Sequence, residues 1–537
     1  MTSTVIAPPD ALADGSPPPT GDRRTPRAAH PALKGALAGV VATAVGLGAG
    51  ELVAGVMDRP SPITAVAGAV IDNVPRAIER WAISTFGRND KTVLGIGIVV
   101  VLALAGALVG ARAGNRRRPV VVGALTIGAL GVLATLADRV GGPGDAMPVV
   151  AATVAGLGTL LVLLGVRDRP VGTATEGAPL VGRRRFLAYT GLSAAGAVAL
   201  TAGGRRVGSD KGATASRAAL ASGLPPPVRP LGAPPAGVDL AIDGLTPWTV
   251  PNADFYRIDT AFVVPKIDAR SWKMEIGGMV DRPRSFTYDD LLKRDLVEAD
   301  VTLMCVSNDV GGSLVGNARW LGVPLIELLE EAGVQEQAEQ VFSTSADGWT
   351  AGFPKQVAMD GRNALVAVGM NGEPLPFAHG FPARLVIPGI YGYVSATKWL
   401  TRIELLRWDD QDGYWIPRGW SRLAPVKTSS RIDVPGRGDR IDPGRTVLAG
   451  VAWAQHRGIA KVEVQVGADE PWQEATLAAD GGVDSWRQWK LEWNATRGDY
   501  TIAVRATDND GATQSGDYVP PAPDGAEGFH TIEVRVN

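Results

Sequence analysis

The residue with the clearest chemical potential is Cys305, the one cysteine in a chain of 537 residues. A predicted strand over 301–306 delivers it to a loop that contains Asn308, Gly311 and Gly312. Glycines let the backbone approach a ligand closely, and a thiolate is a strong donor to a metal. A single thiol excludes an internal disulfide, a cysteine-based zinc site and a cysteine-ligated iron–sulfur cluster within this chain. The competing interpretation is an inert core cysteine.

The sequence lacks the motifs of several other common catalytic sites. The sequence has no Gly-x-Ser-x-Gly elbow, no Gly-Lys-Ser/Thr phosphate loop and no His-Glu-x-x-His motif. Its four histidines, His30, His379, His456 and His530, argue against a multi-histidine metal centre. A hydrolase with Cys305 as nucleophile and His379 as base is an alternative.

The cysteine loop resembles the metal-binding loop of the sulfite oxidase superfamily of molybdopterin enzymes. The similarity is carried by Cys305, by Asn308 three residues later, and by the run Gly316-Asn-Ala-Arg-Trp-Leu-Gly-Val-Pro-Leu325. The resemblance implies one molybdenum held by a pterin dithiolene, with Cys305 as the single protein ligand to the metal and Asn308 as a cofactor contact. It also implies a two-electron oxygen-atom transfer to or from a small substrate.

A second stretch is similar to the pterin-binding run of the same family. It contains His379-Gly-Phe-Pro-Ala-Arg384 and, further on, Lys398-Trp-Leu. The resemblance implies that Arg384 offers a planar fork of donors and Lys398 a point charge to the phosphate of the pterin, while His379 hydrogen-bonds the pterin or phosphate. Ala396 and Thr397, just before the lysine, are implied cofactor contacts as well. The competing interpretation places these cations on a solvated face.

An upstream segment adds four candidates by the same resemblance. Asn252, Phe255, Tyr256 and Arg257 occupy the place of the family's Phe-Phe-x-Arg segment. They are implied to line the mouth of the cofactor site, with Arg257 near the open position on the metal.

Three further positions qualify the resemblance. Asp347 is implied to contact the pterin, with an ordinary turn aspartate as the alternative. Tyr414 is implied to be an active-site tyrosine beside the open metal position, with core packing as the alternative. Val310 stands where vertebrate-type sulfite oxidases carry an arginine for their anionic substrate, which does not favour sulfite as the substrate. The loop is closer to the bacterial branch that includes a periplasmic methionine sulfoxide reductase, although that enzyme lacks an appended β domain.

Two folded units are expected after residue 203. Prolines in 204–237 predict a semi-rigid linker. Short strand-like and helix-like runs alternate over 238–425, which favours an α+β catalytic domain. In 426–537 about seven strand-like runs separated by turns predict an all-β immunoglobulin-like sandwich, similar to the family's dimerisation domain. A homodimer through this C-terminal unit is the implied assembly.

The N-terminal part is predicted to be membrane-embedded. Residues 1–30 predict a disordered tail, and 31–203 contains five apolar runs long enough to cross a bilayer. The runs cover about 35–57, 92–111, 119–137, 148–166 and 186–203. Basic clusters before the first, between the second and third, and between the fourth and fifth spans orient the chain with its catalytic part outside the cytoplasm. The short run 63–74 is expected to be interfacial or re-entrant.

The entrance to the fifth span, Arg183-Arg-Arg-Phe-Leu, resembles a twin-arginine export signal, with the positive-inside rule as the alternative. Ala197-Val-Ala199 is a candidate cleavage site. A formal net charge of −2 excludes a global basic surface and therefore argues against nucleic-acid binding. The sequence has no haem motif, so a quinone or cytochrome at the membrane is the expected electron partner. A membrane-tethered receptor is the alternative function, and a transport component with Glu51 in its first span is a third.

Overall fold

The computed structural model describes residues 31–537 apart from nine short segments. The omitted segments are 76–77, 79–80, 83–84, 87–88, 114–115, 139–140, 166–182, 208–210 and 221–222. The predicted tail 1–30 and most of the basic segment between the fourth and fifth spans lie outside the described residues.

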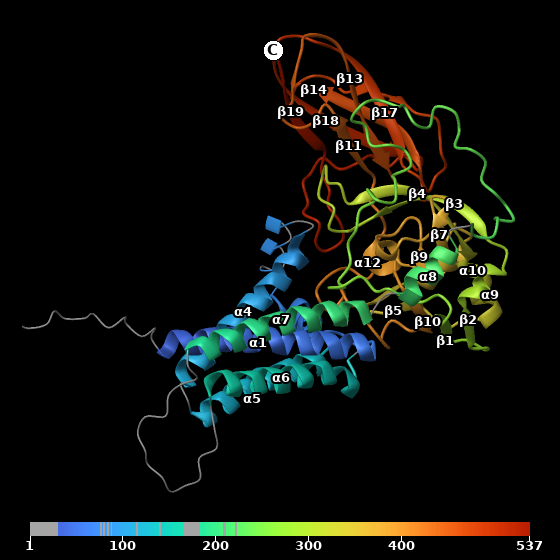
Figure 1. Cartoon of the computed structure of the whole chain (residues 1–537). Coiled ribbons are helices and arrows are strands. Elements are labelled where there is room, and N and C mark those ends of the chain that lie inside the picture. The colour runs from blue at the N-terminus through green and yellow to red at the C-terminus, as the bar shows by residue number, and fades with distance from the viewer. Residues whose placement is uncertain are drawn as a thin grey trace, which may run out of the picture.

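Five helices in the described part are long and apolar enough to cross a membrane, as the sequence predicted. They are α1 (Pro31–Met57), α4 (Asp90–Ala113), α5 (Arg117–Leu136), α6 (Met147–Leu164) with the short η2 (Pro143–Ala146) before it, and α7 (Arg183–Val207). The run expected to be interfacial forms the 12-residue helix α2 (Pro62–Asn73). Figure 1 shows α1, α5, α6 and α7 side by side, away from the C-terminal strands. Membrane association is therefore supported, and the side of the catalytic part stays a prediction.

Glycines allow α1 and α4 to pack backbone to backbone. A Cβ added at Gly39 would collide with the carbonyl of Gly106, and one added at Gly35 would collide with the carbonyl of Gly110. Both pairs are spaced four residues apart, which places them on one face of each helix. Small residues at this spacing are the common means by which membrane helices approach closely.

The middle of the chain forms two sheets with short helices around them. One sheet has the order β3-β4-β7-β8 with β9 paired to β7, and the other has the order β2-β1-β10-β5-β6. The strands are β1 (Lys273–Gly278), β2 (Arg284–Thr287), β3 (Val297–Met304), β4 (Val315–Pro324), β5 (Gln340–Ser345), β6 (Thr350–Pro354), β7 (Leu365–Met370), β8 (Glu373–Pro374), β9 (Arg384–Val386) and β10 (Leu400–Leu406). The helices are α8 (Lys211–Ala219), α9 (Tyr288–Leu292), α10 (Leu325–Ala332), α11 (Lys355–Met359), η3 (Phe377–His379) and α12 (Gly392–Ser395). This mixture agrees with the expected α+β character.

The C-terminal part consists of two further sheets. Their orders are β11-β13-β17-β16 and β12-β19-β18-β14-β15. The strands are β11 (Ser429–Val434), β12 (Arg440–Ile441), β13 (Gly444–Trp453), β14 (Ile459–Val466), β15 (Gln473–Glu474), β16 (Thr476–Leu477), β17 (Arg487–Ala495), β18 (Gly498–Asp508) and β19 (His530–Val536). Alternate residues of β19, such as Ile532 and Val534, are buried in a core that the two sheets share. The part is all-β, and its likeness to an immunoglobulin domain stays a prediction.

The C-terminal sheets are joined to the two middle sheets by buried contacts. Trp453 and Trp486 belong to the same apolar core as β3 and β4. The indoles of Trp248 and Trp486 each donate to the other residue's carbonyl oxygen, at 3.2 and 2.9 Å. Gln455 donates to the carbonyl of Thr302 on β3 at 3.0 Å. The C-terminal part therefore stabilises the position of β3, the strand that leads to Cys305.

Candidate functional site

Cys305 follows the last residue of β3 and opens the loop to β4. Its amide donates to the carbonyl of Leu314 at 2.9 Å, and its carbonyl accepts from the amide of Asn308 at 3.1 Å. The side chain is only 8% exposed. Burial raises the pKa of the thiol, although hydrogen bonds from Ser307 and the charge of Lys398 act in the opposite direction. The thiol is thus held neutral at a fixed position at the edge of the sheet.

Asn308 fixes the loop around the cysteine. Its side-chain oxygen accepts from the amide of Leu314 at 2.6 Å, and the residue is almost fully buried. A Cβ added at Gly312 would lie 2.5 Å from that same oxygen. Gly311 has a φ of +75° and packs against the ring of His530, so neither glycine has room for a side chain.

Arg384, on β9, is the most unusual charge of the site. It is 5% exposed, and its guanidinium donates to the carbonyls of Leu385, His379 and Ala396 at 3.2, 3.2 and 3.4 Å. It also lies over the ring of Trp320, 5.0 Å from the centroid. Burial lowers the pKa of Arg384 to about 10, which leaves it charged at neutral pH. Among the described residues, no carboxylate forms an ion pair with it.

Lys398 is the second buried cation. Its ammonium donates to Asp259 Oδ2 at 2.8 Å and to the carbonyl of Ala378 at 3.3 Å. Burial lowers the pKa of Lys398 to about 8, against the opposing effect of Asp259. The neighbouring Thr397 is fully buried, and its hydroxyl lies 2.7 Å from that of Ser343 on β5.

His379 begins the segment 379–398, which we call the cation run because it contains Arg384 and Lys398. His379 links this run to the upstream segment. Its Nε2 lies 2.9 Å from the carbonyl oxygen of Asn252, and its ring meets that of Phe255 edge to face at 5.5 Å between centroids. Burial, together with the charge of Arg384, lowers the pKa of His379 to about 4, so the ring is neutral at pH 7. The side-chain amide of Asn252 donates to Glu373 Oε1 at 2.8 Å, which fixes the segment against β8.

The rest of the upstream segment lies between this run and Cys305. Phe255 stacks on Tyr256 at 5.2 Å between centroids. Burial raises the pKa of Tyr256, and the nearby Cys305 raises it further. Arg257 is 39% exposed and donates to Asp259 Oδ2 at 2.8 Å. The structure therefore brings the upstream segment, the cysteine loop and the cation run together.

Two of the predicted residues have their described contacts elsewhere. The hydroxyl of Tyr414 donates to Asp72 Oδ1 on α2 at 2.9 Å, and Arg418 lies 3.7 Å from the centroid of its ring. The side chain of Asp347 accepts from the amide of Trp349 at 3.2 Å, which is the geometry of a turn aspartate. These contacts place Tyr414 at the junction with the N-terminal helices and Asp347 in the β5–β6 turn, and their implied roles beside the metal and the pterin stay predictions.

Sequence reasoning missed two residues of the site. Asp259 accepts from both Lys398 and Arg257, and only its spacing of two residues from Arg257 could have indicated it. Tyr391 is fully buried, and burial raises its pKa to about 12, with Cys305 among the smaller contributors. No local pattern marks Tyr391 as a neighbour of the cysteine.

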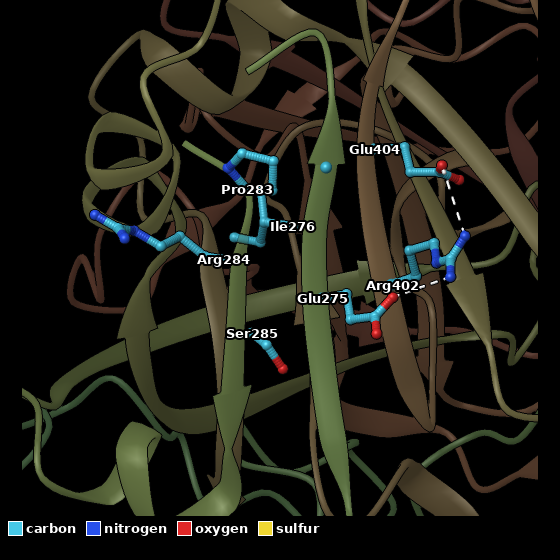
Figure 2. Close-up of a pocket in the computed structure, with 8 residues that line it drawn as sticks. Glu275, Ile276, Pro283, Arg284, Ser285, Arg402 and Glu404 are labelled. Atoms are coloured by element: carbon cyan, nitrogen blue, oxygen red, sulfur yellow. Dashed lines mark hydrogen bonds and ion pairs between the residues drawn. The ribbon is translucent and has the colours of Figure 1, made fainter. Parts of the chain in front are cut away.

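A separate hollow of about 370 Å³ lies over the outer face of β1, β2 and β10. Figure 2 shows Arg402 there between Glu275 and Glu404, to which it is ion-paired at 2.9 and 3.8 Å. Its charges are exposed and mutually compensated, in contrast to the buried cations beside Cys305. Surface pairs of this kind contribute little free energy.

Comparison with known proteins identifies the class. Residues 261–415 match the family model of the oxidoreductase molybdopterin binding domain. The chain is 33% identical over 153 residues to the uncharacterized oxidoreductase YuiH of Bacillus subtilis, which covers 28% of this chain and 74% of that protein. It is 27% identical over 310 residues to mitochondrial sulfite oxidase of Rattus norvegicus, which covers 49% of this chain and 56% of that enzyme.

The chain belongs to the sulfite oxidase superfamily of molybdopterin-dependent oxidoreductases. It spans little more than half the length of the rat enzyme. Among solved structures, the sulfane dehydrogenase SoxCD of Paracoccus pantotrophus is similar at 24% identity and a TM-score of 0.48, covering 55% of this chain and 82% of that one.

Proposed function

We propose that this chain is a membrane-anchored oxidoreductase that faces the extracytoplasmic side and transfers an oxygen atom to or from a small substrate. The observation that carries the proposal is the buried guanidinium of Arg384, whose described partners are carbonyl oxygens and an aromatic ring. A buried cation without an acid is costly to folding. An anionic ligand explains why it is retained, and the phosphate of a pterin cofactor is such a ligand.

The residues present fit a molybdenum–pterin cofactor. Arg384 and Lys398 supply buried positive charge, His379 supplies a neutral ring, and Asn308 with two glycines shapes the loop beside Cys305. Ala396 and Thr397 contribute backbone and hydroxyl contacts next to these cations. When bound, the cofactor supplies the two-electron chemistry of oxygen-atom transfer.

The chain's own residues then have distinct roles. Cys305 is the proposed metal ligand, and because burial keeps the thiol protonated, metal binding would release its proton. Asn252, through its carbonyl, orients His379, and Phe255 with Tyr256 excludes water from the same side. Arg257 is partly exposed at the mouth, where a small substrate would enter.

The remaining parts of the proposal concern organisation. The basic segment around Arg116 to Arg118, together with an odd number of spans, supports placing the catalytic part outside the cytoplasm. We assign residues 204–237 to a linker, in which the helix α8 is docked on the middle part through Arg217 and the carbonyls of Pro374 and Leu375. We assign 238–425 to the catalytic domain and 426–537 to an immunoglobulin-like dimerisation domain. A quinone or cytochrome in the membrane is the proposed electron partner.

Metal and pterin analysis of the purified full chain tests the function. Expressed in a host with a working cofactor pathway, it should contain about one molybdenum and one pterin per chain. Cys305→Ala should abolish dye-coupled activity on sulfite, methionine sulfoxide or related small oxides while the pterin is largely retained. Arg402→Ala, which removes an exposed guanidinium from the hollow of Figure 2, is the matched control and should keep full activity. A purified chain without molybdenum would favour the receptor function instead.

A further inference from the structure

The membrane helix α4 reaches into the catalytic part through its second residue, Lys91. The ammonium donates to Asp259 Oδ1 at 2.6 Å, to the carbonyl of Asp259 at 2.9 Å and to the carbonyl of Ala261 at 2.5 Å. A lysine ammonium has three donor hydrogens, so these three oxygens, which we call the socket, provide one acceptor for each of them. The side chain is 24% exposed, and the carboxylate is only 5% exposed. The contact joins residues 168 positions apart in the chain.

Interactions within the helix do not explain why a lysine occupies this position. A cation in the first turn of a helix opposes the helix dipole. The reason for its position must therefore lie in the tertiary contact. The socket is formed by Asp259 and Ala261, which directly follow the upstream segment of the cofactor site.

Asp259 connects Lys91 to a cofactor-binding residue. Oδ1 accepts from Lys91 and, at 3.4 Å, from Arg257 Nη2, whereas Oδ2 accepts from Lys398 and from Arg257 Nε, both at 2.8 Å. Burial by itself would raise the pKa of Asp259, but the charges of Lys398, Lys91 and Arg257 hold it well below its usual range. Three cations surround one carboxylate, so the cluster keeps an excess of positive charge next to Arg384.

We propose that Lys91 is a positioning residue for the cofactor site: it neutralises Asp259 and thereby leaves the charge of Lys398 available to the anionic cofactor. Without Lys91, the buried carboxylate has both oxygens available for Lys398 and Arg257. It then competes with the phosphate for Lys398, in surroundings where water screens charges weakly. The inference rests on the proposed function, because it assigns Lys398 to the cofactor. It makes cofactor retention depend on a residue of the membrane part.

Other contacts hold α2 and α4 against the catalytic part independently of this charge. Phe262 lies in the space that a side chain on Gly95 would fill, with its ring edge 3.1 Å from that Cβ position. On α2, the carboxylate of Asp72 accepts from the hydroxyl of Tyr414 at 2.9 Å, and its backbone carbonyl accepts from Arg418 at 3.2 Å. Removing the charge of Lys91 should therefore leave the two parts docked, which separates an electrostatic role from a docking role.

The test measures pterin content per chain in full-length protein purified in detergent. Lys91→Met keeps the length of the side chain but removes its charge, and it should lower pterin content at least fivefold. Lys91→Arg should stay near the wild-type value. The double variant Lys91→Met with Asp259→Asn removes the competing carboxylate as well, so it should recover most of the lost pterin. Phe262→Ala weakens docking without changing charge and should retain pterin.

Each contrary result is informative. Wild-type pterin content in Lys91→Met would overturn the inference. It would also be overturned if the double variant stayed as low as Lys91→Met, or if Phe262→Ala lost as much pterin as Lys91→Met, because a structural role would then suffice. A wild-type chain without pterin would overturn the proposed function, and the inference with it. A loaded wild type without rescue overturns the inference alone.

Discussion

At the scale of single residues, the site contains charged side chains in buried positions, where a charge lowers the stability of the fold. Arg384 and Lys398 are each less than a tenth exposed, and only Lys398 has a carboxylate partner among the described residues. Buried groups of this kind lower stability unless a ligand compensates them. The residues that hold a cofactor are thus expected to weaken the chain when it is empty.

Replacing Arg384 by Met should separate the contribution of its charge to cofactor binding from the effect of that charge on the stability of the empty chain. Met fills a similar volume without charge, so pterin content should fall by at least tenfold. The cofactor-free chain, made in a host without pterin synthesis, should instead gain about 1 kcal/mol in its free energy of unfolding. Thermal unfolding of both empty proteins measures the gain. A lower unfolding temperature in the variant would show that its three carbonyl contacts stabilise the empty chain more than burial of the charge destabilises it.

The buried histidines should make stability depend on pH. Burial lowers the pKa values of His379 and His530 to about 4. In the unfolded chain each histidine takes up a proton near its usual pKa of about 6.5, so the unfolded state binds more protons between these values. Stability should fall as pH drops from about 6.5 to about 4, by about 1.4 kcal/mol for each unit of pKa difference.

His530→Asn provides the control for this pH dependence. The Nδ1 atom of His530 accepts from the amide of Ile432 at 3.0 Å, and the Oδ1 atom of asparagine can replace that acceptor. Thermal unfolding between pH 4 and 7 should show a shallower decline in this variant. An unchanged decline would assign the effect to other groups.

At the scale of elements, close backbone packing sets the position of helix α4 against helix α1. In the membrane part, α1 and α4 approach through Gly39 and Gly106, where a Cβ would collide with the facing helix. Because the first residues of α4 hold Asp259, the packing of this helix also bears on the cofactor site.

Gly106→Leu should therefore disrupt the bundle. The added side chain would meet Thr43 and the carbonyl of Gly39 on α1, so the helices must separate. We expect the yield of monodisperse protein in detergent to fall severalfold, as measured by size-exclusion chromatography. Gly97→Leu is the matched control on the same helix, because a Cβ there meets no atom within 4 Å. Equal yields of the two variants would show that close packing at Gly106 is not required.

At the scale of the whole molecule, the chain combines a helical part with five candidate membrane spans, the part with the cofactor site and the C-terminal sheets. The catalytic part is held from both sides, by α2 and α4 at one junction and by Trp453 and Trp486 at the other. Figure 1 shows the C-terminal strands at the end of the molecule opposite the helices. The dimer interface proposed for the C-terminal sheets would therefore lie away from the helices.

The orientation in the membrane can be tested by labelling. The single native cysteine can be removed as Cys305→Ser, and one new cysteine introduced at a time at exposed positions. A membrane-impermeant maleimide added to spheroplasts should label Asp510→Cys, which lies in the C-terminal part. It should label Arg118→Cys, at the start of the third span α5, only after lysis. The reverse pattern would place the catalytic part in the cytoplasm.

The sequence by itself determined the elements whose signals are local. Apolar length marked the five spans, and strand-like runs separated by turns marked the all-β character of residues 426–537. The chemistry of Cys305, His379, Arg384 and Lys398 was visible because residue type and spacing are properties of short segments.

Only the tertiary structure decided which distant residues share a site. It placed Lys91 and Asp259 together across 168 positions, put Tyr391 near Cys305, and assigned Tyr414 to Asp72 across 342 positions. Such pairings depend on how sheets and helices pack, since a buried charge is satisfied by whichever partner the fold brings within reach. No periodicity or spacing in the chain encodes that choice locally, which is why Asp259 emerged from the structure rather than from the sequence.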